Sequence, residues 1–552
     1  SVERFRDRLA TSTDAELNDV AFTAAVGRDR FGVRMGVSGR TSRDVVQSLE
    51  KWLARPVMPE TGSRDGARVA WFFTGQGSQY SGMASELYRH DVSRDVIDRL
   101  TNRLNTIHGI DILSALLTSS PEDDAALART SVTQPALYVV QCALSALWQS
   151  RGVEPAAVIG HSVGEFAAAW VAGVFSLEDG LDLIATRGRL MDTLGLPGGM
   201  VAVSADIDRA TTLAANLPVE VAALNAATQI VMAGPHAALD TFMARCEADD
   251  VTATRLVTSH AFHSALIEPA LPGLVEAAAR IRHHAPRLPW ISNLTGAPVV
   301  TAPSPEYWRD HARQTVRFEH GIRALEALAV TAGLEIGPSP VLIGLARRTA
   351  GSRRAWIASL DRRRPAEEVM ADAVVALHAV GVNLDGDALY PHARRVSLPT
   401  YPFATERHWF ETPGEPASRP TLTRATDAKF YDVAWQSRPF PTPATGPELE
   451  ILRAHLSVFE PALRAHTQTA NLPDALQALD SVALDWAHAA IAGLAAGGRL
   501  PGRAHAKTLE DADIDLWNTR LGIAPRHHRL ANRLLRWLAA HDRIVRAEDG
   551  WR

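Results

Sequence analysis

The sequence predicts an α/β protein of several parts. We expect an α/β-hydrolase-like parallel-sheet domain with an inserted ferredoxin-like subdomain, a small α/β linker domain at the N-terminus and a mainly helical C-terminal segment. Three observations predict this. Apolar strands alternate with helices from about residue 66 onward, as a parallel sheet requires. Residues 157–166 are typical of a strand, a Gly-x-Ser-x-Gly turn and a helix, the order of a nucleophile elbow. Between about 199 and 258 the order changes to βαββαβ, which is ferredoxin-like.

Composition favours a multidomain enzyme of the cytoplasm. The 552 residues are 46% hydrophobic and 22% charged with a formal charge of −5, which indicates neither disorder nor affinity for nucleic acid or a membrane surface. We find no long apolar run and no signal peptide. Cys142 and Cys246 lack the spacing of metal ligands or redox pairs, so metal chemistry is not expected. The missing initial methionine and the arginine-rich basic residues favour a segment of a longer, bacterial protein.

The N-terminal part, residues 1–65, is interpreted as a small α/β piece. A helical pattern covers Val2–Leu9, a strand-like run covers residues 25–37, and a second helix covers Ser42–Ala54. An apolar strand over Ala67–Phe73 then opens the main domain.

The elbow places Ser162 at a helix N-terminus. Unpaired N–H groups and the positive end of the helix dipole favour a developing oxyanion there. Gly160 and Gly164 leave room for the tight backbone crossing. His161 and Glu165 are interpreted as structural residues that pack, cap or form ion pairs beside the turn.

The inserted subdomain is predicted from six segments that alternate between strand and helix patterns. These segments are, in order, Met200–Ser204, Ile207–Ala215, Val219–Asn225, Gln229–Ala233, Pro235–Ala248 and Thr252–Val257.

Four further motifs complete the candidate site. A glycine loop (residues 72–79) follows the first strand of the main domain, and Arg187 lies in a helix opened by the capping box 176–179. Ser-His-Ala-Phe-His-Ser occupies residues 259–264, and Arg-Gln-Thr-Val-Arg-Phe occupies residues 313–318. The ordered occurrence of these motifs with the elbow is far more specific than the elbow alone.

With these motifs, residues 1 to about 411 resemble the malonyl-type acyltransferase domain of a modular type I polyketide synthase. The resemblance implies that Ser162 is acylated and that His263 is the base. It further implies that Gln76 and Val163 supply the oxyanion hole, that Arg187 holds the substrate carboxylate and that the carbonyl of Gln314 orients the histidine. His260, Ala261 and Phe262, in place of Tyr-Ala-Ser, accompany malonyl selection in that family. Val163 and residues 134–138 also fit the malonyl pattern.

The resemblance also implies the reaction, the partners and the domain boundaries. A malonyl group is expected to move from malonyl-CoA to the phosphopantetheine thiol of an acyl carrier protein, without a bound cofactor. The expected partners are the neighbouring ketosynthase and downstream domains of the same synthase. Neither nucleic acid nor a membrane is expected as a partner. The predicted parts are the ketosynthase-to-acyltransferase linker (1–65), the large subdomain (66–198 and 259–365), the small subdomain (199–258), the post-acyltransferase linker (366–420) and a downstream segment (421–552).

The downstream segment weakly resembles the N-terminal lid of a C-methyltransferase. We expect helices over Ser481–Ala496 and Pro525–Ala540 followed by a hairpin. No Gly-x-Gly-x-Gly loop follows a strand, so the S-adenosylmethionine-binding core is not expected in this chain. From residue 421 onward 16 basic residues face 15 acidic ones, which argues against DNA binding by a helix and wing.

Three alternative functions remain open at this level. The first is an acyltransferase that selects methylmalonyl or another acyl-CoA. The second is a serine hydrolase or thioesterase, which would usually place an Asp or Glu before the histidine and would not need Arg187. The third is a non-catalytic scaffold, which the intact Ser162 and His263 disfavour.

Overall fold

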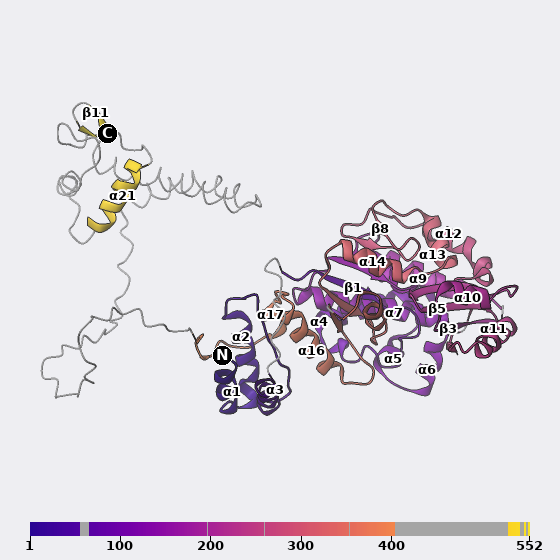
Figure 1. Cartoon of the computed structure of the whole chain (residues 1–552), viewed down its shortest axis with the longest axis horizontal. Helices are drawn as coiled ribbons and strands as arrows, with labels where there is room; N and C mark the ends of the chain where they lie inside the picture. The colour runs from indigo at the N-terminus through magenta and orange to yellow at the C-terminus, as the bar shows by residue number, and fades with distance from the viewer. Residues whose placement is uncertain are drawn as a thin grey trace. The chain divides into compact units, whose positions relative to one another are not determined.

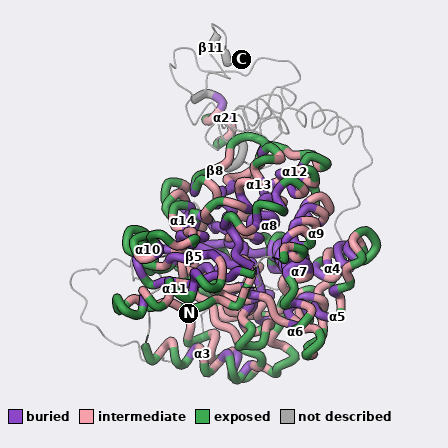
Figure 2. Tube along the Cα trace, turned by 90° about the vertical axis from the view of Figure 1, so that its right-hand side faces the viewer, coloured by how far each residue is buried: buried purple, intermediate pink, exposed green. Residues whose placement is uncertain are grey.

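The computed structural model describes residues 1–55, 66–195, 197–258, 260–352, 354–402, 528–540, 546–547 and 550–551. The chain divides into two compact units, Ser1–His408 and Trp409–Arg552 (Figure 1). Within the first unit, the buried part of the trace gathers around α7, α8 and β5 (Figure 2). None of the described helices is both long enough and apolar enough to cross a membrane.

The large subdomain is built on a six-stranded sheet. The strand order is β10-β9-β1-β2-β7-β8, with the first five strands parallel and β8 antiparallel at the edge. The central strand β1 reads Val-Ala-Trp-Phe-Phe and is buried along its whole length, so both faces of the sheet are covered. The strands are β1 (Val69–Phe73), β2 (Ala157–Gly160), β7 (Trp290–Ile291), β8 (Pro298–Val299), β9 (Ala332–Ile336) and β10 (Ala355–Ala358).

Helices and short helical turns connect these strands, and α7 and α9 pack extensively against each other. The elements are η2 (Leu87–Arg89), α4 (Asp91–Arg103), η3 (Leu104–His108), α5 (Leu113–Leu117), α6 (Pro121–Ala128), α7 (Thr130–Ser150), α8 (Gly164–Val171), α9 (Leu177–Asp192), η4 (Ala265–Ala270), α12 (Leu271–Ala279), α13 (Pro305–Arg313), α14 (Phe318–Ala327), α15 (Leu342–Ala350), α16 (Ala366–Ala379) and α17 (Gly386–Leu389).

The small subdomain confirms the predicted ferredoxin-like order. Its four-stranded antiparallel sheet has the order β4-β5-β3-β6, and an apolar cluster that includes Val201, Met232 and Phe242 forms its own core. The elements are β3 (Gly198–Val203), α10 (Ile207–Leu213), β4 (Glu220–Ala226), β5 (Gln229–Pro235), α11 (His236–Ala248) and β6 (Ala253–Arg255).

The N-terminal part differs from the prediction, because the strand expected within residues 25–37 is not formed. The described residues 1–55 contain α1 (Val2–Ala10), the turn η1 (Asp14–Glu16), α2 (Leu17–Val26) and α3 (Ser42–Ala54). Residues 27–41 are irregular because they pair with no neighbouring strand and contain four glycines, which weaken strands. Arginine side chains hold this stretch instead: Arg30 donates to the carbonyl of Leu384 (2.9 Å) and Arg34 to that of Val382 (3.2 Å).

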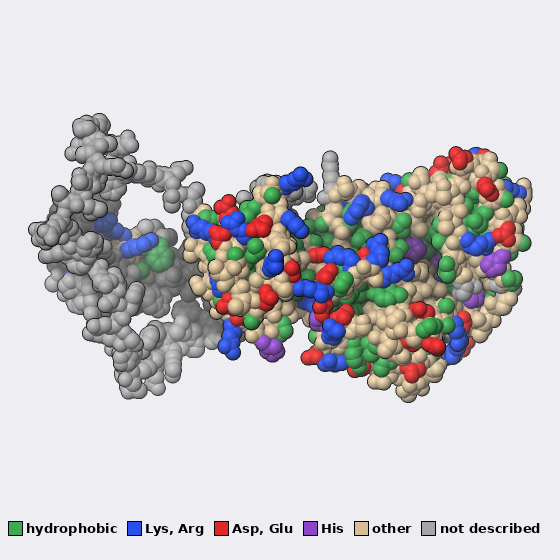
Figure 3. Space-filling view, turned by 90° about the horizontal axis from the view of Figure 1, so that it is seen from below, with side chains coloured by type: hydrophobic (Ala, Val, Ile, Leu, Met, Phe, Trp, Pro, Cys, Tyr) green, Lys and Arg blue, Asp and Glu red, His purple; other side chains and the backbone are tan. Residues whose placement is uncertain are grey.

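The segment after the large subdomain returns to these N-terminal helices. The backbone N–H of Arg394 donates to Asp19 (2.7 Å), and that of Val396 donates to Thr23 (3.0 Å). On the face that Figure 3 displays, basic and acidic side chains intermingle. An ion pair between Arg40 and Glu368 (3.1 Å) joins the N-terminal part to α16.

In the second unit, the structure describes the helix α21 (His528–Ala540) and a hairpin of β11 (Arg546–Ala547) and β12 (Gly550–Trp551). Leu535 and Leu538 of α21 are buried. This helix coincides with the second helix that we predicted here, and the hairpin follows it as expected. The helix predicted over Ser481–Ala496 and the rest of the proposed methyltransferase lid lie outside the described residues.

Candidate active site

The turn between β2 and α8 holds Ser162 in a left-handed conformation, with φ of 49°. Its two glycines are needed for close approach. A Cβ on Gly160 would lie 2.2 Å from the nitrogen of Glu165, and a Cβ on Gly164 would lie 2.2 Å from the carbonyl oxygen of Phe73. A side chain at either position would therefore force the helix away from the sheet, which explains the Gly-x-Ser-x-Gly spacing in physical terms.

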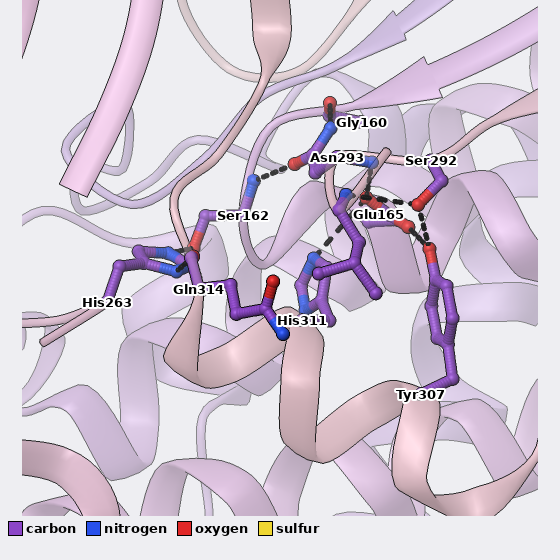
Figure 4. A network of polar contacts seen from close by, with 10 residues as sticks. Gly160, Ser162, Glu165, His263, Ser292, Asn293, Tyr307, His311 and Gln314 are labelled. Carbon is purple, nitrogen blue, oxygen red and sulfur yellow. Dashed lines mark hydrogen bonds and ion pairs between the residues drawn. The ribbon is translucent and has the colours of Figure 1, made fainter. Parts of the chain in front are cut away.

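Asn293, which follows β7, fixes this strained turn (Figure 4). Its Oδ1 accepts the backbone N–H of Ser162 (2.7 Å), and its Nδ2 donates to the carbonyl of Gly160 (2.7 Å). The sequence analysis did not identify Asn293. The pairing of β7 with β2 puts it at the carboxyl end of the neighbouring strand, where site residues of parallel sheets gather.

Glu165 lies on the side of the elbow that faces α13, and its carboxylate is fully used there. Oε2 accepts the backbone N–H of Asn293 (2.7 Å), and Oε1 accepts the hydroxyl of Tyr307. Nε2 of His311 lies 3.3 Å from Oε2. Glu165 and His311 are both buried, so this network, which Figure 4 draws, supports the turn from within the protein. The sequence analysis interpreted Glu165 as structural but did not find Tyr307 or His311.

His263 contacts the serine directly. Its Nε2 lies 2.8 Å from Oγ of Ser162, and its Nδ1 lies 3.0 Å from the carbonyl oxygen of Gln314 (Figure 4). A carbonyl oxygen only accepts hydrogen bonds, so in the neutral ring Nδ1 carries the proton and Nε2 offers its lone pair to the serine hydroxyl. The tautomer is therefore the one that a general base needs.

The surroundings of His263 keep it neutral. Burial lowers its pKa well below the usual value, and the nearby positive charge of Arg187 lowers it further. A neutral imidazole is able to accept the serine proton at neutral pH.

Arg187 lies on α9, whose first turn is capped by Ser176 accepting the N–H of Asp179 (3.1 Å). Arg187 is 1% exposed, and burial lowers the pKa of its guanidinium to about 9, so the group stays protonated at neutral pH. Nη1 donates to Oε1 of Gln134 (2.6 Å), and the group lies 5.9 Å from the ring centroid of Phe166. Among the described residues, Nε and Nη2 have no hydrogen-bond partner. A buried cation thus keeps two unused donors, which is the requirement for gripping a carboxylate.

The two expected oxyanion residues lie at the same edge of the sheet. The register pairs Phe73 of β1 with Gly160 of β2, so the glycine loop that contains Gln76 and the elbow that contains Val163 emerge side by side. Val163 directly precedes α8.

The side chain of Gln76 is connected to Arg187 by a chain of hydrogen bonds. Oγ1 of Thr130 donates to Oε1 of Gln76 (3.2 Å) and accepts Nε2 of Gln134 (2.8 Å), while Gln134 accepts Arg187. The sequence analysis noted residues 134–138 only as a motif. In the structure Gln134 accepts a hydrogen bond from the buried guanidinium of Arg187 and so orients it.

The residues expected to set specificity are all buried. His260 and Phe262 lie with ring centroids 5.7 Å apart, and Ala261 and Phe262 belong to the same apolar cluster as Val163 and Phe166. Phe262 directly precedes His263, whose ring contacts Ser162.

A cavity of about 420 Å³ reaches His263 from the side of the small subdomain. The residues that line it include Glu220 and Val221 of β4, Met232 of β5, and His263, Arg313 and Gln314.

Comparison with known proteins identifies consistent relatives. A family profile described as "Acyl transferase domain" matches residues 70–382, and one described as "CurL-like, PKS C-terminal" matches residues 1–49. The spectinabilin polyketide synthase system protein NorA′ of Streptomyces orinoci is 36% identical over 74% of this chain and 12% of its own length. The PKS-NRPS hybrid synthetase acdB of Aspergillus candidus is 34% identical over 76% of this chain and 18% of its own length. The chain thus spans less than a fifth of these two proteins.

Solved structures agree with this relationship. The acyltransferase domain from the second module of the salinomycin polyketide synthase is 35% identical, with a TM-score of 0.61 over 71% of this chain and 95% of that domain. The acyl transferase domain of SpnD, in complex with 2-(pent-4-yn-1-yl)malonyl, is 31% identical, with a TM-score of 0.63 over 71% of this chain and 94% of that domain.

Proposed function

The chain belongs to the acyl transferase domain family of polyketide synthases, and on that premise we propose that it transfers malonyl from malonyl-CoA to the phosphopantetheine thiol of an acyl carrier protein. The intermediate is a malonyl ester of Ser162. The relatives are polyketide synthase proteins several times longer than this chain, which supports an acceptor carried by another domain of the same synthase. Neighbouring ketosynthase and downstream domains of the same cytoplasmic synthase are the further proposed partners.

The observation that carries the proposal is the buried guanidinium of Arg187. Nε and Nη2 have no partner among the described residues, and the charge is close enough to His263 to lower the pKa of the imidazole. The free carboxylate of malonyl matches two parallel donors of a guanidinium. An acetyl group has no carboxylate, so the unused donors favour a dicarboxylic acyl group over a simple one.

In the first half-reaction, Oγ of Ser162 attacks the thioester carbonyl carbon while Nε2 of His263 takes the hydroxyl proton. The N–H groups of Val163 and Gln76 hold the oxyanion, and the loss of one such donor typically costs about a hundredfold or more in rate. The carbon–sulfur bond then breaks, and the imidazolium returns its proton to the departing CoA sulfur. The products are free CoA and the Ser162 ester, and no cofactor takes part.

The second half-reaction reverses these steps with a different thiol. His263 takes the proton of the carrier phosphopantetheine thiol, and the sulfur attacks the ester carbonyl. The ester bond breaks, and the proton passes from the imidazolium to Oγ of Ser162. The kinetics are therefore ping-pong.

Selection of malonyl over methylmalonyl is proposed to rest on Phe262, with His260 and Ala261 completing the wall. The buried phenyl ring fills space that an α-methyl group would need. One methyl group in such a pocket is worth roughly 1–3 kcal/mol, so the preference is expected to be real but incomplete.

The contacts of His263 favour transfer over the alternative of hydrolysis. Its Nδ1 faces the carbonyl of Gln314, whereas serine hydrolases of this general fold usually place a carboxylate there. A hydrolase would also have no use for a buried arginine with open donors.

The test is incubation with malonyl-, methylmalonyl- or acetyl-CoA without a carrier protein, followed by intact-mass and peptide analysis. We expect a stable malonyl adduct on Ser162, smaller amounts with the other donors, none in Ser162→Ala, and its loss when a phosphopantetheine thiol is added. Rapid CoA release without an adduct would instead identify a hydrolase. The absence of both adduct and CoA release would identify a scaffold.

A further inference from the structure

One carboxylate of the small subdomain reaches both segments that hold the histidine. Glu220 is the first residue of β4. Its Oε1 accepts the backbone N–H of Ala265 (2.8 Å), and its Oε2 accepts Nη1 of Arg313 (2.9 Å). Arg313 also donates from Nε to Glu268 (2.8 Å), so two acidic side chains hold the same guanidinium.

These contacts lie immediately beside the bond that orients the proposed base. Ala265 is two residues after His263, and Arg313 directly precedes Gln314, whose carbonyl lies 3.0 Å from Nδ1 of His263. Glu220 therefore connects the segment that contains His263 to the segment that contains Gln314, next to the hydrogen bond between the histidine and the carbonyl.

The histidine segment needs such support. His263 has φ of 58°, a left-handed conformation that is unfavourable for a residue with a Cβ and persists only where the surroundings impose it. The cavity of about 420 Å³ lies on the side of the ring that faces the small subdomain. Two hydrogen bonds hold the turn: Oγ of Ser264 donates to the carbonyl of Ala261 (2.7 Å), and Glu220, which also lines the cavity, accepts the N–H of Ala265 (2.8 Å).

The partner segment is already anchored to the same strand. Backbone bonds join β4 to Val316: its N–H donates to Ala222 (2.9 Å), and its carbonyl accepts the N–H of Leu224 (2.8 Å). The segment with Gln314 is thus fixed to the small subdomain, and Glu220 brings the histidine segment to it.

We propose that Glu220, acting with Arg313, is a positioning residue that couples the small subdomain to the proposed base, holding His263 against the carbonyl of Gln314 and aimed at Ser162. The inference rests on the proposed acyl transfer. In this proposal Glu220 acts through the histidine and not on the substrate. In the ion pair between Glu220 and Arg313, the side chains are 39% and 28% exposed. Ion pairs with that exposure contribute little to stability, so we expect the effect of Glu220 in the rate of acylation.

The test compares Glu220→Ala, Glu220→Gln and the matched control Glu276→Gln, which disrupts an exposed ion pair between Glu276 of α12 and Arg280 just after that helix. The measurement is the single-turnover rate of Ser162 malonylation across malonyl-CoA concentrations. We expect Glu220→Ala to lower the saturating rate by about tenfold to a hundredfold, with the half-saturating concentration changed less than about twofold. Glu220→Gln should fall between, because its amide oxygen still accepts the N–H of Ala265, and the control should behave as the unchanged protein.

A double variant separates positioning from a general structural effect. If Glu220 acts through the histidine, Glu220→Ala should cause no further loss of the residual acylation in a His263→Ala background. A wild-type saturating rate in Glu220→Ala, or an equal loss with and without His263, would overturn the inference. If Glu220→Ala does not fold, Glu220→Gln carries the same comparison. Failure of the unchanged protein to form any Ser162 adduct is a different result, because it overturns the proposed function itself.

Discussion

Two buried ionisable side chains, Glu165 and Arg187, differ in how their hydrogen-bonding capacity is used. Glu165 of α8 is saturated: one oxygen accepts Tyr307, and the other accepts the backbone of Asn293. Arg187 of α9 is equally buried but bonds only to Gln134, with two donor atoms left open among the described residues. Buried polar groups are normally satisfied, because an unsatisfied one costs free energy. Glu165 is fully engaged in the fold, whereas the open donors of Arg187 are the ones that we propose bind the malonyl carboxylate.

Among the residues around the elbow, we expect the largest effect on the reaction from His263. We expect His263→Ala to slow malonylation of Ser162 by about a hundredfold to ten-thousandfold, because no other base lies within hydrogen-bond distance of the hydroxyl among the described contacts. CoA release in a stopped-flow assay measures the rate. A loss of less than tenfold would remove His263 from the role of base.

The structural side is tested by unfolding free energies of Glu165→Gln and Arg187→Met. Glu165→Gln turns one acceptor into a donor opposite Tyr307 or the N–H of Asn293, so we expect a loss of roughly 2–4 kcal/mol. Arg187→Met removes a desolvated charge, which offsets the lost bond to Gln134, so we expect a change within about 1 kcal/mol. Denaturant titration measures both, and equal losses would contradict the contrast.

The pH dependence tests the electrostatic coupling between Arg187 and His263. Burial and the charge of Arg187 disfavour the imidazolium and lower the pKa of His263 well below its usual value. Acylation by acetyl-CoA should therefore stay constant as the pH falls through 6.5, the usual histidine pKa, and decline only below it. In Arg187→Ala the pKa should rise, and the decline should begin at higher pH. A wild-type decline centred at or above 6.5 would contradict a neutral base.

The smallest expected effect concerns substrate size. Phe262→Ser opens space beside the elbow, so the ratio of methylmalonyl to malonyl adduct should rise by about tenfold. Competition of the two donors, read by intact mass, measures the ratio. An unchanged ratio would place the discrimination elsewhere in the pocket.

Local patterns were sufficient to predict the elbow and the small subdomain. The strand–turn–helix order around Ser162 and the alternation over residues 199–258 are encoded within short windows, and both are formed. The strand predicted within residues 25–37 failed because alternating apolar residues specify a strand only where a partner edge exists. Residues 27–37 have no such edge; instead, Arg30 and Arg34 donate hydrogen bonds to the backbone carbonyls of Leu384 and Val382.

The support of the elbow was not predictable in the same way. Asn293 follows β7, a strand of two residues that is too short to give a periodic signal. Tyr307 and His311 lie on α13, and only the tertiary fold brings that helix to Glu165. Neighbouring parallel strands present their carboxyl ends at one edge of a sheet, so the residues after β7 were candidates for the site. Finding them requires the strand order, which the sequence alone did not provide.

The most direct test of the central contrast is the ratio of malonyl to acetyl acylation of Ser162 in the unchanged protein and in Arg187→Ala. If the open donors hold the malonyl carboxylate, Arg187→Ala should lose roughly 2–5 kcal/mol for malonyl-CoA, which is about thirtyfold or more, while acetyl-CoA acylation changes far less and the ratio collapses. An unchanged ratio, with both donors affected equally, would show that the buried arginine does not read the carboxylate and would contradict the account.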